Sequence, residues 1–276
     1  MRAAPQANRP IGIFDSGVGG LTVLKALRAV LPDEDYVYLG DTARLPYGTK
    51  SARSIARYAS QAAAHLARRQ IKLLVVACNT ASAVALEHLG AELAPLPVVG
   101  VVQPGARAAV AARPRGRHLV LATEATVSLG AYGNAIRALD EGAQVEELPC
   151  ELLVALAEEG WTSGAEAVAV VRRYLARYVS EVSPFRPDSL ILGCTHFPLL
   201  QDAIRQVVGP ALSIVDSAST TAGHVAAVLA QGRLRREAGG GRLSLLATDG
   251  ARRFARVGSA FLGAPVAPAD VQVVDL

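Results

Sequence analysis

The sequence lacks several features that mark particular classes of protein. Only three of its 276 residues are cysteines, which is too few for the disulfide framework of a small secreted domain. No apolar run reaches the length of about eighteen residues that a membrane-spanning helix needs. The first ten residues, MRAAPQANRP, lack the apolar stretch of a signal peptide. These absences predict a cytoplasmic protein with free thiols and no membrane partner.

Signs of nucleic-acid or cofactor binding are equally scarce. The net charge is only +4, and no dense basic run is interleaved with aromatics, so a nucleic-acid partner is not expected. No cluster of His, Cys and Asp has zinc spacing, and none of the three lysines lies in a recognisable pyridoxal site. The glycines at 17–20 and the segment GTKS at 48–51 match neither the dinucleotide fingerprint nor a P-loop. The sequence therefore predicts chemistry without a metal or a cofactor.

Short apolar runs recur along the chain, and each lacks the polar alternation of a half-exposed strand. They cover residues 11–14, 35–39, 73–77, 98–102, 118–123, 189–193, 213–216 and 243–248. Such runs are typical of strands buried on both faces. Between many of them lie stretches with helical spacing, such as 51–69 and 165–178. This alternation predicts an α/β fold with parallel sheets.

A weak internal duplication predicts two similar halves. Residues 73–86 and 189–204 both run from an apolar strand through a cysteine and a polar pair into a helix, and residues 11–27 resemble 119–136 less closely. Pro-Gly breaks near residues 104 and 210 mark the expected crossings. We expect one domain from 9–103 plus 215–276 and a second from 104–214. They would be open parallel-sheet domains with a pseudo-twofold relation and an active site between them. The Gly-rich segment 233–243 is expected to be an exposed loop.

Cys78 and Cys194 are the most informative residues, because ligands gather at the carboxyl ends of parallel strands. A lone cysteine there is more often a small buried hydrophobe, but two in matched contexts favour function. At a helix start each would have a lowered thiol pKa. From opposite sides of one cleft, one thiolate could remove a Cα proton while the other thiol delivers one. Cys150 has no such context and is expected to be structural.

Other polar groups fall at the same strand ends. Asp15 precedes a glycine-rich loop and could assist proton transfer near a cysteine, although an aspartate there is also a common helix cap. His196 could relay a proton or fix a carboxylate, where a lone histidine would more often be a packed polar residue. The segment 41–48, with its Pro-Tyr-Gly bend, is either a surface turn or a loop that closes over a small polar ligand.

At these residues the sequence resembles the glutamate racemases of the aspartate/glutamate racemase superfamily. The resemblance covers essentially residues 9–276. Its markers are IGIFDSGVGGLTVL at 11–24, DTARLPYGTKS at 41–51, VACNTASA at 76–83 and LGCTHFPLL at 192–200. Together these four segments are highly specific, whereas any one of them would be weak.

The resemblance implies a cofactor-independent, two-base racemase that interconverts L- and D-glutamate and supplies D-glutamate for peptidoglycan and hence cell-wall synthesis. It implies that Cys78 acts on D-glutamate and Cys194 on L-glutamate, with Asp15 beside the first thiol and Glu158 and His196 beside the second. Family members dimerise in different ways, so a homodimer is the default expectation. The implied substrate-binding residues are Asp15, Ser16, Tyr47, Gly48, Asn79, Thr80, Thr126, Thr195 and His196.

The sequence departs from the family pattern before the expected glutamate. The family commonly has Cys-Pro and a further proline there, whereas this chain has Cys150-Glu151 and no proline before Glu158. The family's glutamate is therefore assigned to Glu158 with Glu159 as the alternative. Phe197, where tyrosine is frequent, should alter packing more than chemistry.

Three rival functions differ in what they require. A sister racemase acting on aspartate would use the same two cysteines, and only its substrate profile would differ. A binding or regulatory protein that kept the fold would not need either thiol. A thiol hydrolase would need one cysteine with a histidine partner and no second cysteine. The presence of both cysteines favours a racemase over the binding protein and the hydrolase, and the choice of glutamate rests on the resemblance.

Overall fold

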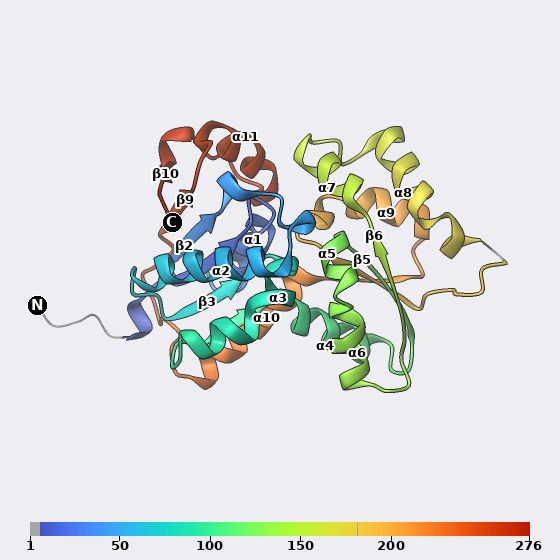
Figure 1. The fold of residues 1–276 in the computed structure, drawn as a ribbon, viewed down its shortest axis with the longest axis horizontal. Coiled ribbons are helices and arrows are strands. Elements are labelled where there is room, and N and C mark those ends of the chain that lie inside the picture. Colours follow the sequence, from blue (N-terminus) through green and yellow to red (C-terminus); the bar gives the residue numbers. More distant parts are fainter. Residues whose placement is uncertain (1–5, 181) are drawn as a thin grey trace, which may run out of the picture.

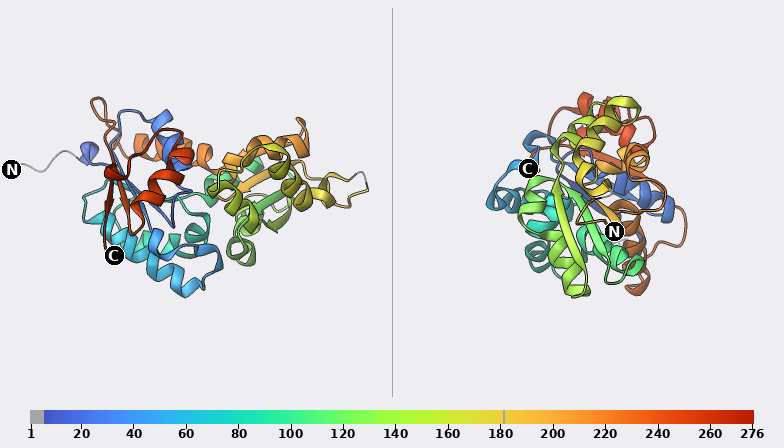
Figure 2. Two further views of the ribbon diagram at one scale, coloured as in Figure 1. Left: turned by 90° about the horizontal axis from the view of Figure 1, so that it is seen from above. Right: turned by 90° about the vertical axis from the view of Figure 1, so that its right-hand side faces the viewer.

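Ten strands form two separate parallel sheets in the part of the chain that the structure, a computed structural model, describes, which is residues 6–180 and 182–276. The first sheet has the order β10-β9-β2-β1-β3-β4 and the second the order β6-β5-β7-β8. Figures 1 and 2 show the two sheets in separate lobes along the long axis of the molecule. The predicted α/β class with two parallel sheets is confirmed.

Eight of the ten strands lie near the predicted apolar runs, whereas β6 and β10 were not predicted. The first sheet contains β1 (Ile11–Asp15), β2 (Tyr36–Gly40), β3 (Leu73–Val76), β4 (Val98–Gly100), β9 (Leu243–Ala247) and β10 (Val271–Val273). The second contains β5 (Arg117–Ala122), β6 (Gln144–Pro149), β7 (Ser189–Gly193) and β8 (Ser213–Asp216). The four residues of β3 and the five of β7 are all buried, as expected for strands covered on both faces.

Helices cover both faces of each sheet. They are α1 (Leu21–Val30), α2 (Ala52–Ala67), α3 (Asn79–Glu92), α4 (Val102–Ala112), α5 (Glu124–Ser128), α6 (Ala131–Leu139), α7 (Glu151–Glu158), α8 (Gly164–Val179), α9 (Gln201–Val208), α10 (Ser217–Gln231) and α11 (Ala251–Leu262). Short 3₁₀ turns are η1 (Gln6–Asn8), η2 (Thr42–Arg44), η3 (Tyr47–Thr49), η4 (Phe197–Leu200) and η5 (Pro268–Asp270). No helix in residues 6–180 and 182–276 is long and apolar enough to cross a membrane.

The predicted helix at 51–69 shows why such segments fold as they do. Ser51 caps α2 by accepting a hydrogen bond from the backbone N–H of Ser54. Ile55, Ala59 and Leu66 then repeat at helical spacing and are buried against the first sheet. The helix therefore turns its apolar stripe to the core and its arginines toward solvent.

The same strand order recurs in both sheets. The order β2-β1-β3-β4 in the first corresponds to β6-β5-β7-β8 in the second, and so β3 with Cys78 corresponds to β7 with Cys194. The expected domain boundaries, at 103/104 and 214/215, fall inside α4 and β8. The division of the chain into domains stays a prediction.

Helix α10 links the two halves. It follows β8 of the second sheet, packs closely along α1 of the first half and also contacts α4. One continuous apolar core therefore extends from the first half into the second. In Figure 2 this orange helix lies near the middle of the molecule.

The segment 233–243 is only partly the exposed loop that was expected. Most of it is exposed, but the side chain of Arg236 is buried and donates hydrogen bonds to Asn8 and Asp35. Beside it the buried Lys72 forms an ion pair with Glu34 and donates to the carbonyl of Leu234. Buried charges must be paired, so this network fixes the segment against the amino ends of the first sheet.

Candidate active site

Both cysteines follow a buried strand, but their local settings differ. Cys78 follows β3 and caps α3, and its sulfur accepts a hydrogen bond of 3.4 Å from the N–H of Ala81. Cys194 follows β7, but a turn and the 3₁₀ helix η4 separate it from α9. The expectation that each cysteine begins a helix therefore holds for Cys78 only. In the turn, Cys194 has the side chain of His196 as its neighbour instead.

The two cysteines line one small cavity between the sheets, of about 60 Å³. Each is about 6% exposed, so both sulfurs are nearly shielded from bulk solvent. Ten of the predicted site residues line this cavity: Ser16, Tyr47, Gly48, Cys78, Asn79, Thr80, Glu158, Cys194, Thr195 and His196. The structure thus brings together residues from five separate segments of the sequence.

Two predicted residues lie behind the cavity wall rather than in it. The Asp15 carboxylate accepts hydrogen bonds from the N–H of Gly17 and the hydroxyl of Tyr38. The hydroxyl of Thr126 lies within hydrogen-bond distance of the hydroxyls of Thr80 and Thr123. Both side chains are buried and both touch residues that reach the cavity.

Six lining residues were not among the predicted site residues: Gly17, Leu45, Pro46, Thr123, Glu151 and Val154. Leu45 and Pro46 belong to the segment 41–48, which was expected to close over a ligand. Glu151 and Val154 lie on α7 at the i and i+3 positions, and Glu158 is at i+7. This spacing marks one helix face, so it could have identified both residues once Glu158 was assigned.

A chain of contacts extends outward from Cys194. The Cys194 sulfur lies 3.7 Å from Nδ1 of His196, and Nε2 of His196 lies 3.2 Å from Oε1 of Glu158. Glu158 is therefore the glutamate that contacts His196, whereas Glu159 is exposed. The other oxygen of Glu158 accepts a hydrogen bond of 2.8 Å from Arg253.

This chain governs the charge of the histidine. Burial by itself would lower the pKa of His196, but hydrogen bonds with Cys194 and Glu158 and nearby negative charge raise it to about 10. The hydrogen bond from His196 holds the pKa of the Glu158 carboxyl below its usual value, despite burial. At neutral pH the pair is therefore an imidazolium and a carboxylate.

The opposite thiol is held in its neutral form. Burial raises the pKa of Cys78 to about 12, with a further contribution from the charge of Asp15, against hydrogen bonds from Ala81 and Ser16 that lower it. The predicted lowering of this thiol pKa by a helix start is therefore wrong for Cys78. Here burial outweighs the dipole of α3.

Asn79 carries the clearest sign of a missing partner. Its Oδ1 accepts a hydrogen bond of 2.8 Å from the hydroxyl of Tyr132. Its Nδ2 is buried and has no hydrogen-bond partner within the described chain. An unpaired buried donor is costly, and Asn79 lines the cavity, so this amide is ready to bind an acceptor.

The loop with Tyr47 and Gly48 is fixed from behind by Asp41. The fully buried Asp41 carboxylate accepts hydrogen bonds from Tyr47 and Thr248 and pairs with Arg44. This network ties η2 and η3 to the turn that follows β9. The predicted alternative of a free surface turn does not fit these contacts.

Gly19 makes a close approach between the two halves possible. A Cβ atom at Gly19 would lie 2.4 Å from Nδ1 of His196 and 2.5 Å from Oγ1 of Thr195. Both distances are shorter than any normal contact, so only glycine fits here while His196 keeps its place.

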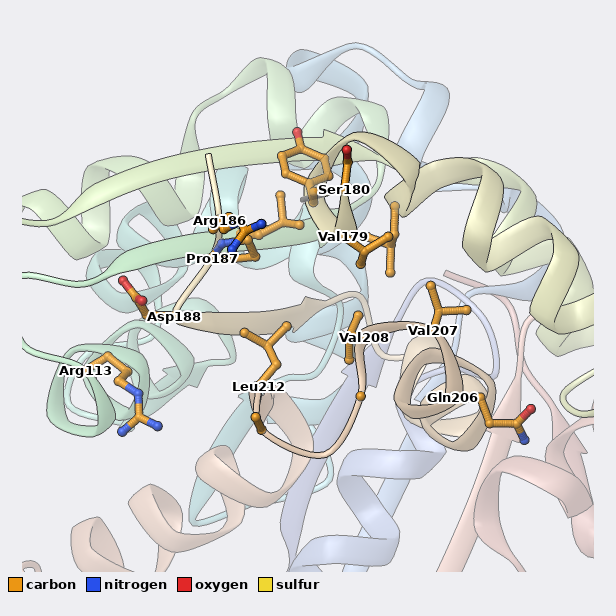
Figure 3. Close-up of a pocket in the computed structure, with 15 residues that line it drawn as sticks. Arg113, Val179, Ser180, Arg186, Pro187, Asp188, Gln206, Val207, Val208 and Leu212 are labelled. Carbon is orange, nitrogen blue, oxygen red and sulfur yellow. The ribbon is translucent and has the colours of Figure 1, made fainter. Parts of the chain in front are cut away.

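A much larger cavity, of about 650 Å³, lies elsewhere in the second half (Figure 3). It is formed by the ends of α8 and α9 and by residues such as Asp188 and Leu212, which precede β7 and β8. These are the amino ends of the strands, where parallel sheets do not gather ligands. None of the predicted site residues lines it.

Potential metal ligands and the state of the three cysteines also bear on the chemistry. Within the described residues there is no group of three or more His, Cys, Asp or Glu side chains that could hold a metal ion. Cys78, Cys150 and Cys194 are all free thiols. Cys150 is fully buried and part of the apolar core, and it does not line the cavity.

Comparisons with known proteins agree with one another. The family model described as Asp/Glu/hydantoin racemase matches residues 21–225. The glutamate racemase of Geobacter metallireducens is 48% identical over 256 residues, covering 92% of this chain and 93% of that protein. The crystal structure of the Francisella tularensis glutamate racemase in complex with D-glutamate has a TM-score of 0.88 at 32% identity, with 98% of each chain covered. That of the Thermus thermophilus enzyme in complex with β-chloro-D-alanine has a TM-score of 0.86 at 42% identity, again with 98% of each chain covered.

Proposed function

Since this chain belongs to the Asp/Glu/hydantoin racemase family, we propose that it interconverts L-glutamate and D-glutamate by a two-base reaction. One observation carries the proposal: two free, buried cysteines from corresponding strands of the two sheets line a single small cavity. Inversion at carbon needs a base on one face and an acid on the other, and this arrangement supplies one from each half.

Each turnover moves one proton onto one sulfur and another off the opposite sulfur. From L-glutamate, the Cys194 thiolate takes the Cα proton, forming S–H as the Cα–H bond breaks. The Cys78 thiol then gives its proton to the opposite face of Cα and becomes a thiolate. The reverse reaction starts from that state, so the two directions use the same pair with exchanged roles.

The charges around the two thiols support this assignment of starting roles. With its pKa raised to about 12, Cys78 is a thiol at neutral pH and ready to donate. The protonated His196 lies 3.7 Å from the Cys194 sulfur, where its positive charge would stabilise the thiolate. We assign His196 to Cys194 and Asp15 to Cys78 as the groups that adjust the charge of each thiol.

The substrate would be held by small neutral donors. The unpaired Nδ2 of Asn79 suits a carboxylate oxygen, and the hydroxyls and amides of Ser16, Thr80 and Thr195 line the same cavity. Tyr47 and Gly48 close it from the loop that Asp41 anchors. Thr126 would act through its contact with Thr80.

The experiment that tests the proposal follows both optical rotation and Cα deuterium when glutamate is incubated with the purified protein in D₂O without added cofactor. The unmodified protein should racemise both enantiomers and incorporate deuterium. Cys78→Ala and Cys194→Ala should each lose racemisation by at least about a hundredfold, the low end of the effect of a proton-transfer group.

Cys150→Ala is the matched control, because it removes the third buried thiol without touching the cavity, and it should retain activity. Racemisation of aspartate with glutamate left unchanged would overturn the choice of substrate. Full racemisation by Cys78→Ala would overturn the two-base reaction, and hydrolysis of an amide or ester that needs Cys194 but not Cys78 would favour a thiol hydrolase. Binding of glutamate with no exchange at Cα would indicate a binding protein.

Three wider assignments accompany the reaction. We propose that the D-glutamate is used for peptidoglycan synthesis, as the family resemblance implies, and that the protein acts in the cytoplasm. We also propose a homodimer, since closed twofold pairs are the commonest oligomers of soluble proteins. The mass of the purified protein in solution tests the dimer.

A further inference from the structure

Arg253 forms an ion pair that crosses the cleft between the two halves. It lies on α11, which packs on α1 and β10 of the first half, whereas its partner Glu158 lies at the end of α7 in the second. The two groups approach to 2.8 Å. Arg253 is 54% exposed, whereas the Glu158 side chain is 18% exposed, so the contact joins the surface to the buried site.

Arg253 does not line the cavity that holds the cysteines. It lines a neighbouring cavity of about 160 Å³, which shares Glu158 and Leu45 with the first. It therefore has no contact with the reacting atoms, and any effect on the reaction must pass through Glu158.

Glu158 uses its two oxygens for two different partners. One is 3.2 Å from Nε2 of His196, and the other accepts from Arg253. A carboxylate held at both oxygens has one orientation, whereas a carboxylate held only by the histidine can rotate toward solvent. The bond from Arg253 thus fixes the oxygen that His196 uses.

From these contacts we propose that Arg253 is a positioning residue, which holds Glu158 against His196 and so completes the Cys194 half of the site only when the two halves are closed. The effect of Arg253 on catalysis rests on the proposed function. The placement of Glu158 by Arg253 can be measured without turnover.

The groups that face His196 decide whether its pKa rises or falls when Arg253 is replaced. They are Cys194 at Nδ1, Glu158 at Nε2 and the nearby charge of Asp15, with the ring of Phe261 packed edge-on at 5.0 Å. Removing a cation near this cluster would, by charge alone, raise the histidine pKa. Losing the carboxylate from Nε2 would lower it. A positioning role and a simple charge effect therefore predict opposite shifts.

The test measures the His196 imidazole by NMR in ¹⁵N-histidine-labelled protein, with the signal assigned by its loss in His196→Asn. In Arg253→Met we expect the pKa of His196 to fall by about one unit, a tenfold change in its proton affinity. In Arg253→Lys, which keeps a cation, the pKa of His196 should stay close to its value in the unmodified protein. Arg256→Met, an exposed arginine on the same helix, should leave it unchanged. Because Arg253 is exposed, its loss leaves no hole in the core, and the variants should fold.

Kinetics supply the second readout. In Arg253→Met, the alkaline limb of the kcat/KM profile should move to lower pH by the same unit, so that kcat/KM falls about tenfold at a pH above both limits and little at the plateau. An unchanged or raised pKa of His196 in Arg253→Met would overturn the inference. If the unmodified protein racemises nothing, the proposed function fails, and the NMR titration still decides the role of Arg253.

Discussion

A single histidine should impose a pH dependence on the stability of the protein. The pKa of His196 is about 10 in the folded state and 6.5 as the ordinary value, because hydrogen bonds with Cys194 and Glu158 outweigh burial. Between these values the folded protein holds a proton that the unfolded chain has lost. The stabilisation is therefore complete below pH 6.5 and is lost as the pH rises toward 10.

We expect the free energy of unfolding in urea to decrease by roughly 1 kcal/mol per pH unit between pH 6.5 and 8.5. His196→Asn should lose this slope, and His88→Asn, which alters an exposed histidine, should keep it. Equal slopes in the unmodified protein and His196→Asn would show that His196 is neutral in the folded state.

At the scale of residues, the sequence shows which side chains are reactive better than it shows which side chains touch each other. Cys78, Cys194 and His196 could be found because strand ends are marked by apolar runs and because their residue types carry reactivity. Glu158 could not be separated from Glu159 by sequence, since only the rotation of α7 turns one of them to His196. Arg253 gave no signal at all, because its partner is 95 residues away on the other half.

The η2–η3 loop shows how an element without regular structure can be held rigid. Oγ1 of Thr248 donates to Asp41 over 3.0 Å and accepts from the N–H of Ala43 over 2.9 Å. Tyr47, which lines the cavity, binds the same carboxylate. The loop therefore depends on a hydroxyl that lies two hundred residues further along the chain.

Thr248→Val removes this hydroxyl at nearly constant volume. We expect a loss of about 1–2 kcal/mol in the free energy of unfolding, because the buried Asp41 carboxylate loses one of its donors, and a higher KM for glutamate because the loop is less ordered. Thr49→Val, at an exposed position on the same loop, is the control. If KM is the same in both variants, the loop does not close over the substrate.

At the scale of elements, burial decides what the sequence can predict. Strand β7, for example, begins and ends where its apolar run does, because all five of its residues are buried. The edge strands β6 and β10 were missed, since β6 contains Glu146 and Glu147 and is only partly buried. The turn after Cys194 was taken for a helix start, because polar residues after a strand look alike in either case.

The small size of the cavity has a consequence for the whole molecule. Its volume of about 60 Å³ is well below the roughly 300 Å³ of the smaller ligand pockets, and both cysteines are nearly inaccessible. We therefore expect the two halves to separate to admit the substrate and to close again around it.

Amide hydrogen exchange should detect this motion. With saturating D- and L-glutamate we expect slower exchange in η3 and α7, which face each other across the cavity, and little change in the covered strand β5. Cys78→Ala/Cys194→Ala protein allows the measurement without turnover. Unaltered exchange in η3 and α7 would mean that the halves do not move apart.

Gly19 matters for closure, because it lacks the Cβ atom that every other amino acid carries. A methyl group at this position would collide with His196 and Thr195 before the two halves had fully come together. A substitution at this position would then prevent the closed form without disturbing the core of either half. Over evolution, we expect loss of this glycine to give a folded protein whose two halves stay apart.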